Sequence, residues 1–273
     1  MKRIRPFTLK AATTLILSTT TCLSQTPTAQ PTPAPQPTPA PSTIQPQPIN
    51  PAPPKPLPAF YRNLILLDPA HGGPDSGAHL PDNALEKNVT LAFAQRLRPA
   101  LAAQGFTVVA TRDSDPTAGL ANDQRAGTAN HTRPLACILI HATATGSGIH
   151  LASSSLTQLD GTSTPPRALA WDRAQAPTLP MSLRLANEIG LALVDAHLPV
   201  ILLRASVPPI DNVICPAVVI EVAPLSPSSG NRTAVTDAAY QQRIADAVAN
   251  AVASFRTHNA PPPAPRTTSG APQ

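Results

Sequence analysis

Proline is distributed unevenly along this chain, and its distribution limits which parts can fold. The 273 residues include 36 prolines, which crowd into residues 27–58 and 261–265. Proline lacks a backbone N–H and has a fixed φ, so it interrupts helices and sheets. Such segments also bury little apolar surface, so we predict a disordered Pro-rich linker over residues 26–60 and a disordered tail over residues 258–273. Residues 61–257 are expected to form one domain.

Residues 1–25 have the pattern of a signal peptide. A charged start (residues 1–5) precedes a short apolar stretch (residues 9–17), and small and polar residues follow. We therefore expect an exported protein of the periplasm or cell envelope. A disordered basic tail is the alternative interpretation. Lipidation of Cys22 would tether the protein to the membrane, but the residues before Cys22 match a lipoprotein signal poorly, which favours cleavage.

The charge pattern argues against a nucleic-acid partner. The net charge is +5, and much of the excess lies in the first ten residues. Only 3% of the residues are aromatic, and the body of the chain has no basic run. Phosphate backbones are bound by clustered cations and stacking platforms, which this composition does not supply. We expect a monomer without a nucleic-acid partner.

Apolar runs and helical spacings alternate along the foldable region. Strands are predicted over residues 64–67, 106–110, 136–140, 148–152, 200–203 and 217–220, and helices over residues 86–104, 120–131, 181–197 and 235–255. Continuous apolar strands between helices indicate a sheet that is covered on both faces. The predicted fold class is α/β: a three-layer α/β/α arrangement with a mostly parallel central sheet of about six strands. Pro99 is expected to kink the first long helix.

Two cysteines, Cys137 and Cys215, lie within or beside the apolar runs. They are either small buried side chains or partners in a disulfide, which an exported protein can form. The sequence leaves both interpretations open, because it does not place the two residues in contact.

Polar residues stand where predicted strands end. His71 lies in a loop directly after the first strand, His141 follows the third, and Glu221 follows the last. Ligands of parallel α/β sheets bind outside the carboxyl ends of the strands, so these side chains can converge. Glu86 opens the first long helix, just after the His71 loop, and can face the same crevice.

Two imidazoles and a carboxylate suit a catalytic zinc site, which has three protein ligands and one open position. Zinc lowers the pKa of bound water and polarises a carbonyl, and a further carboxylate can then carry the proton. We predict one Zn²⁺ per chain, held by His71, Glu86 and His141, with Glu221 as the catalytic carboxylate. Each histidine could instead be an ordinary loop or core residue. The negative charge of Glu86 could have no other role than to complement the positive N-terminus of its helix.

Several segments, in order, resemble the zinc-dependent N-acetylmuramoyl-L-alanine amidases of bacterial cell walls (type 3). The resemblance implies the same ligands, His71, Glu86 and His141, and the same catalytic residue, Glu221. It also implies hydrolysis of the amide between N-acetylmuramic acid and L-alanine in peptidoglycan. The segments are 66–78 (LLDPAHGGPDSGA), 85–88 (LEKN), 109–115 (VATRDSD), Arg125 with Ala129 and Asn130, 140–142 (IHA) and 216–221 (PAVVIE).

The chain departs from the family pattern near these residues. Ala70 stands where the family usually has Gly, and it would strain the loop if its φ were positive. The other departures lie beside His141 and after Glu221, and residues 153–180 match nothing in the family pattern. The departing residues are Leu139, Thr143, Ala223 and Pro224.

These departures keep two alternatives to an active amidase open. One is a catalytically impaired protein that binds peptidoglycan or regulates another enzyme. The other is a zinc peptidase that cuts a different amide of the stem peptide. Peptidoglycan is the expected partner in each case, and an activator protein is a further expected partner. Arg204 is expected to end a strand rather than to contact substrate.

Overall fold

The structure is a computed structural model that describes residues 60–159, 169–226 and 232–260. The predicted signal peptide, with Cys22, the linker up to residue 59 and the tail from residue 261 lie outside the described residues. Within the described part of the chain, no helix is long and apolar enough to cross a membrane.

A six-stranded sheet forms the centre of the fold, as predicted. Its strand order is β2-β1-β3-β6-β4-β5. All neighbouring strands pair in parallel except β4 and β6, which are antiparallel. The strands are β1 (Tyr61–Pro69), β2 (Thr107–Ala110), β3 (Pro134–Ala142), β4 (Ile149–Ser153), β5 (Val200–Arg204) and β6 (Ala217–Val222).

The reversal of β4 changes what lies at the carboxyl edge of the sheet. In the register of β4 and β6, Ile149 pairs with Val222 and His150 pairs with Glu221. The first residues of β4 therefore lie beside the last residues of β6. The edge that collects the carboxyl ends of β1, β3 and β6 also receives the amino end of β4.

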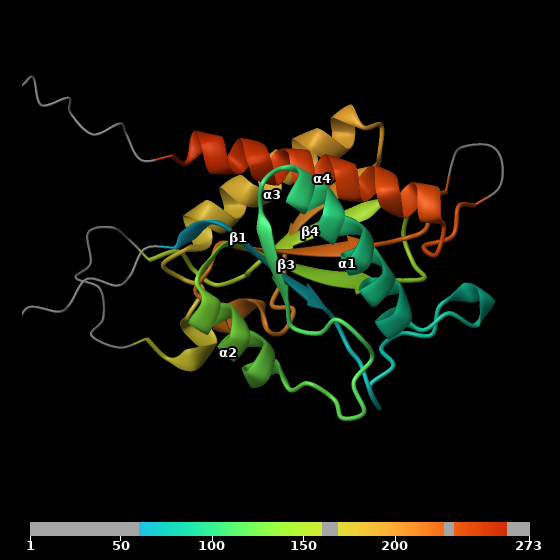
Figure 1. Ribbon diagram of the computed structural model, residues 1–273, viewed down its shortest axis with the longest axis horizontal. Coiled ribbons are helices and arrows are strands. Elements are labelled where there is room, and N and C mark those ends of the chain that lie inside the picture. Colours follow the sequence, from blue (N-terminus) through green and yellow to red (C-terminus); the bar gives the residue numbers. More distant parts are fainter. Residues whose placement is uncertain (1–59, 160–168, 227–231, 261–273) are drawn as a thin grey trace, which may run out of the picture. The chain divides into compact units, whose positions relative to one another are not determined.

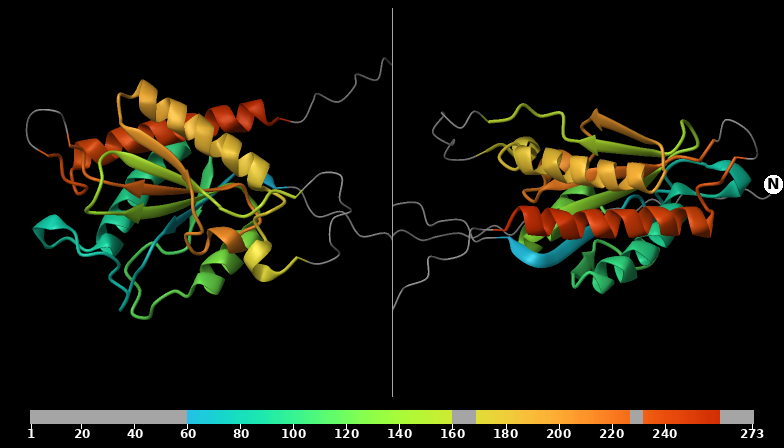
Figure 2. Two further views of the ribbon diagram at one scale, coloured as in Figure 1. Left: turned by 180° about the vertical axis from the view of Figure 1, so that it is seen from behind. Right: turned by 90° about the horizontal axis from the view of Figure 1, so that it is seen from above.

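Four α-helices cover the sheet in two layers (Figure 1). Helices α1, α3 and α4 lie on one face, and α2 lies on the other with two short 3-10 turns, Trp171–Arg173 and Ile210–Asn212. Figure 2 shows α3 and α4 packed side by side. The helices are α1 (Glu86–Ala103), α2 (Asn122–Thr132), α3 (Leu179–Asp195) and α4 (Ala238–His258).

Alternate strand residues feed two separate cores, because successive side chains of a strand point to opposite faces. Ile138 and Ile140 of β3 belong to the larger core under α1, α3 and α4. Cys137 and Leu139 belong to the smaller core on the α2 face. The central strands are therefore apolar on both sides, which explains their continuous apolar runs.

Cys137 and Cys215 are both fully buried and form a disulfide in the smaller core. The bond joins β3 to the segment just before β6, across 78 residues of sequence. Of the two interpretations, the structure has the disulfide, and it lies among buried side chains.

Pro99 is tolerated inside α1, which continues past it to Ala103. Pro99 lies on the exposed side of the helix, so its ring faces solvent.

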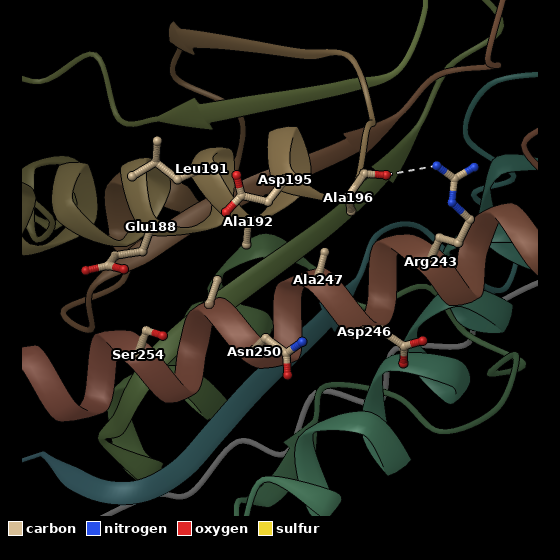
Figure 3. Close-up of a pocket in the computed structure, with 11 residues that line it drawn as sticks. Glu188, Leu191, Ala192, Asp195, Ala196, Arg243, Asp246, Ala247, Asn250 and Ser254 are labelled. Carbon is tan, nitrogen blue, oxygen red and sulfur yellow. Dashed lines mark hydrogen bonds between the residues drawn. The ribbon is translucent and has the colours of Figure 1, made fainter.

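A groove of about 680 Å³ lies between α3 and α4 (Figure 3). Arg243 donates to the carbonyl of Ala196 there, at 2.9 Å. None of the four predicted site residues lines this groove.

Candidate metal centre

The loop that carries His71 leaves β1 directly. β1 ends at Pro69, and the backbone turns at His71, Gly72 and Gly73, whose φ values are 63°, 132° and 60°. A positive φ is unfavourable for a residue with a side chain, so the surrounding structure must hold His71 in place. Ala70 is not among the described residues with positive φ, so the strain considered for an alanine there does not arise.

Two buried arginines hold this loop. Arg125 donates Nη2 to the carbonyl of His71 at 2.7 Å and Nη1 to the carbonyl of Pro69 at 3.0 Å. Arg112 donates Nε to the same Pro69 carbonyl at 2.9 Å. The charge of Arg125 is balanced by the buried Asp68, 2.6 Å away. These bonds to backbone oxygens fix where the His71 ring can lie.

His71, Glu86 and His141 converge, as their places in the sequence predicted. Nε2 of His71 lies 3.1 Å from Oε2 of Glu86, and Nδ1 of His141 lies 3.0 Å from Oε1 of Glu86. One ligand atom from each residue lies within 4.8 Å of the other two. Ligands at zinc distances of about 2.0–2.1 Å would be about 3.3 Å apart in a tetrahedron. The donor set and its spacing therefore fit zinc.

Glu86 bridges the two histidines from the first turn of α1. Burial alone would raise the pKa of its carboxyl. Hydrogen bonds from His141 and His71, and from the backbone N–H groups of Ala78 and Ala142, outweigh that effect and hold the pKa well below its usual range. Glu86 is therefore ionised at neutral pH, as a metal ligand must be.

Asp75 orients the His71 ring from the side opposite Glu86. Its Oδ2 lies 2.8 Å from Nδ1 of His71, which leaves Nε2 turned toward Glu86. The bond to Glu86 is the main reason that the pKa of His71 is raised, and Asp75 adds to it. The bond to His71 lowers the pKa of Asp75. A carboxylate on the second ring nitrogen is the usual support of a metal-binding histidine.

Glu221 lies one strand away from His141 and in register with it. His141 and Glu221 each continue the alternation that places Leu139 and Val219 in the smaller core, so both side chains point to the α2 face. The side chain of Glu221 is 38% exposed, which leaves it accessible to a substrate. The two residues lie within their strands, one position before the strand ends.

His150 is a neighbour of Glu221 that the strand-end pattern of the sequence did not predict. Its Nδ1 lies 2.7 Å from Oε2 of Glu221. Only the reversed direction of β4 brings it to this edge. The pairing of His71 with Asp75 was easier to predict, because the two residues lie four positions apart in one sequence motif.

The departures from the family pattern are built into the local structure. Leu139 is buried in the smaller core, and Thr143 bonds Thr145 through their hydroxyls at 3.0 Å. The carbonyl of Ala223 accepts a hydrogen bond from the Tyr240 hydroxyl at 2.9 Å. Arg204 donates to backbone carbonyls of the segment after β4 and has a structural role, as expected.

Fold and site together define an α/β protein with a candidate mononuclear metal centre of the catalytic type. Two imidazoles and a carboxylate meet at the edge of the sheet, and a second, accessible carboxylate stands beside them. A model of the N-acetylmuramoyl-L-alanine amidase family matches residues 65–254, and the chain belongs to this family.

Individual relatives agree with this assignment. The germination-specific N-acetylmuramoyl-L-alanine amidase of Bacillus subtilis is 54% identical over 52 residues, which cover 19% of this chain and 22% of that protein. The chain thus aligns with about a fifth of that curated relative.

Solved structures show the same fold over a longer span. Ami1 of Mycobacterium smegmatis has a TM-score of 0.57 at 21% identity, covering 74% of this chain and 100% of that one. The CwlD amidase of Clostridioides difficile, solved in complex with the GerS lipoprotein, has a TM-score of 0.53 at 20% identity, covering 72% and 100%.

Proposed function

We propose that this protein is a zinc-dependent amidase that hydrolyses the bond between N-acetylmuramic acid and L-alanine in peptidoglycan. The convergence of His71, Glu86 and His141 beside Glu221 carries the proposal, together with membership of the amidase family. Nε2 of His71, a carboxylate oxygen of Glu86 and Nδ1 of His141 would hold the ion. Bound zinc would polarise the amide carbonyl and lower the pKa of water.

Glu221 is the proposed proton carrier. Hydrolysis adds water across the amide: a C–O bond forms at the lactyl carbonyl, the C–N bond breaks, and the alanine amine leaves. Glu221 takes a proton from the attacking water and delivers it to that amine. The partial exposure of its carboxylate and its register with His141 support this role.

The products test the proposal. Purified peptidoglycan is incubated with the protein, with and without a zinc chelator, and soluble products are identified by mass. We expect intact stem peptides with a free N-terminal alanine, and none with chelator. Cleavage at another stem-peptide amide would identify the zinc peptidase, and bound zinc without products would identify the binding protein.

Glu221→Gln tests the proton carrier, because the amide keeps the shape of the side chain but cannot accept the proton. We expect full zinc content and a loss of kcat of at least about 100-fold. Glu188→Gln is the matched control, since Glu188 lies on α3 and pairs with His258 instead. Retained activity in Glu221→Gln would show that another group carries the proton.

We also propose that the protein works outside the cytoplasm, with peptidoglycan as substrate and with an activator protein as a further partner. The Cys137–Cys215 disulfide supports an oxidising compartment. The charged and apolar pattern of residues 1–25 supports export. The complex of the Clostridioides difficile neighbour with a lipoprotein supports the search for an activator. Fractionation of cells and co-purification with the exported protein test these points.

A further inference from the structure

Among the residues that the structure describes, the Glu221 carboxylate has one hydrogen-bond partner, the ring of His150. His150 is the second residue of β4 and pairs with Glu221 in the antiparallel register of β4 and β6. Nδ1 of His150 lies 2.7 Å from Oε2 of Glu221. The histidine side chain is 15% exposed and the glutamate 38%, so a mostly buried ring contacts a partly open carboxylate.

The surroundings of His150 fix its ring. An ionised carboxylate only accepts hydrogen bonds, so Nδ1 carries the hydrogen that is shared with Glu221. Nε2 is buried and has no hydrogen-bond partner among the described residues. The ring also packs against Gly146, where a Cβ would lie 2.8 Å from Nε2 and 2.7 Å from Cε1. Any side chain at residue 146 would displace the ring.

Glu221 needs such support if it moves protons. A glutamate side chain has several rotatable bonds, so one that nothing holds samples many positions. The bond from His150 holds Oε2. It leaves Oε1, which has no hydrogen-bond partner among the described residues, available to accept a proton.

We propose that His150 is a positioning residue that fixes Glu221 for proton transfer. The inference rests on the proposed amidase function, in which Glu221 carries the proton. His150 acts through Glu221 and donates from a fixed Nδ1–H.

Two substitutions of His150 separate positioning from folding. His150→Leu removes the donor but keeps an apolar volume, and we expect kcat to fall about 10-fold to 100-fold with KM and zinc content unchanged. His150→Asn returns an N–H donor to the position of Nδ1 and is expected to recover most of kcat. Thermal unfolding of both variants reports any loss of folding.

The chain supplies a matched control, because His258 and Glu188 form a histidine–glutamate pair at 2.6 Å on the exposed surface, on helices away from the candidate site. His258→Leu is expected to leave kcat unchanged. The double variant His150→Leu/Glu221→Gln is expected to be no slower than Glu221→Gln alone, because two residues that act as one unit are not additive. Equal kcat in wild type and His150→Leu, no recovery in His150→Asn, or additive losses would each overturn the inference.

Nuclear magnetic resonance of the histidine ring nitrogens separates this inference from the amidase proposal. We expect the Nδ1–H form of His150 in the wild type, with a shifted Nδ1 resonance in Glu221→Gln. An Nε2–H form, or a spectrum unaffected by Glu221→Gln, overturns the positioning role even in an active enzyme. An inactive wild type with the expected ring spectrum overturns the amidase proposal and leaves the His150–Glu221 contact established.

Discussion

Reduction of the Cys137–Cys215 disulfide should remove a large part of the stability of the domain. The bond closes a loop of 78 residues between β3 and the segment before β6. Chain entropy then gives about 4.5 kcal/mol at 25 °C, since a closed loop restricts the unfolded chain. Domains of ordinary size are stable by about 5–15 kcal/mol, so the reduced protein should unfold much more readily.

Urea unfolding of oxidised and reduced protein measures this difference. Both cysteines are fully buried, so the protein is reduced in urea and refolded with reductant present. The side chains are then identical in the two samples, and only the bond differs. We expect the free energy of unfolding to fall by about 4–5 kcal/mol.

The double variant Cys137→Ala/Cys215→Ala is the control for this experiment. Reductant should not change its free energy of unfolding, because it has no bond to break. Peptide mapping of alkylated protein distinguishes this pair from Cys22, the third cysteine. A difference below about 1 kcal/mol between oxidised and reduced wild type would refute the loop-entropy reasoning, and two reactive thiols in the unreduced, unfolded protein would refute the pairing.

Four further predictions concern the candidate metal centre and the adjacent loops. Asp75→Asn should weaken zinc binding about 10-fold to 100-fold in chelator competition, because the charged acceptor on Nδ1 of His71 is lost; unchanged affinity would remove Asp75 from that role. Zinc affinity, measured by calorimetry, should rise from about pH 6 to pH 8, because the raised pKa of His71 lets protons compete with the metal; a flat profile would contradict this. The pKa of Glu86 is lowered, so the stability it contributes to the metal-free protein is present above about pH 4 and lost as pH falls through the lowered value; acid unfolding of Glu86→Gln should lack that loss. Tyr240→Phe should cost about 1–3 kcal/mol in urea unfolding, because the Ala223 carbonyl loses its buried donor; no change would mean that water replaces the hydroxyl.

The candidate site residues at strand ends could be predicted from the sequence because the strands that carry them are parallel. His71, His141 and Glu221 each stand at the carboxyl end of a strand, and β1, β3 and β6 are neighbours in the sheet. Once parallel strands pair, the residues at their carboxyl ends lie together at one edge of the sheet. Glu86 could be predicted because it begins α1, the first long helix after the His71 loop.

The position of His150 beside Glu221 could not be predicted from the sequence in the same way. An apolar run over residues 148–152 predicts a strand but does not give its direction in the sheet. The antiparallel pairing of β4 with β6 depends on contacts between residues about 70 positions apart, which no local pattern contains. The sequence left the Cys137–Cys215 pairing open for the same reason.

The direction of β4 also decides where the chain can accept new sequence. β4 begins at the edge that carries the candidate metal ligands and ends at the opposite edge, so Ser154 leaves the sheet away from the candidate site. The chain returns at the same far edge, where Ser182 of α3 accepts a hydrogen bond from the N–H of Ala217, the first residue of β6. Residues 154–178 thus start and end away from the substrate. A cell-wall-binding module inserted there would add a second attachment without covering the catalytic face, and insertions of differing length in homologues would leave the chemistry intact.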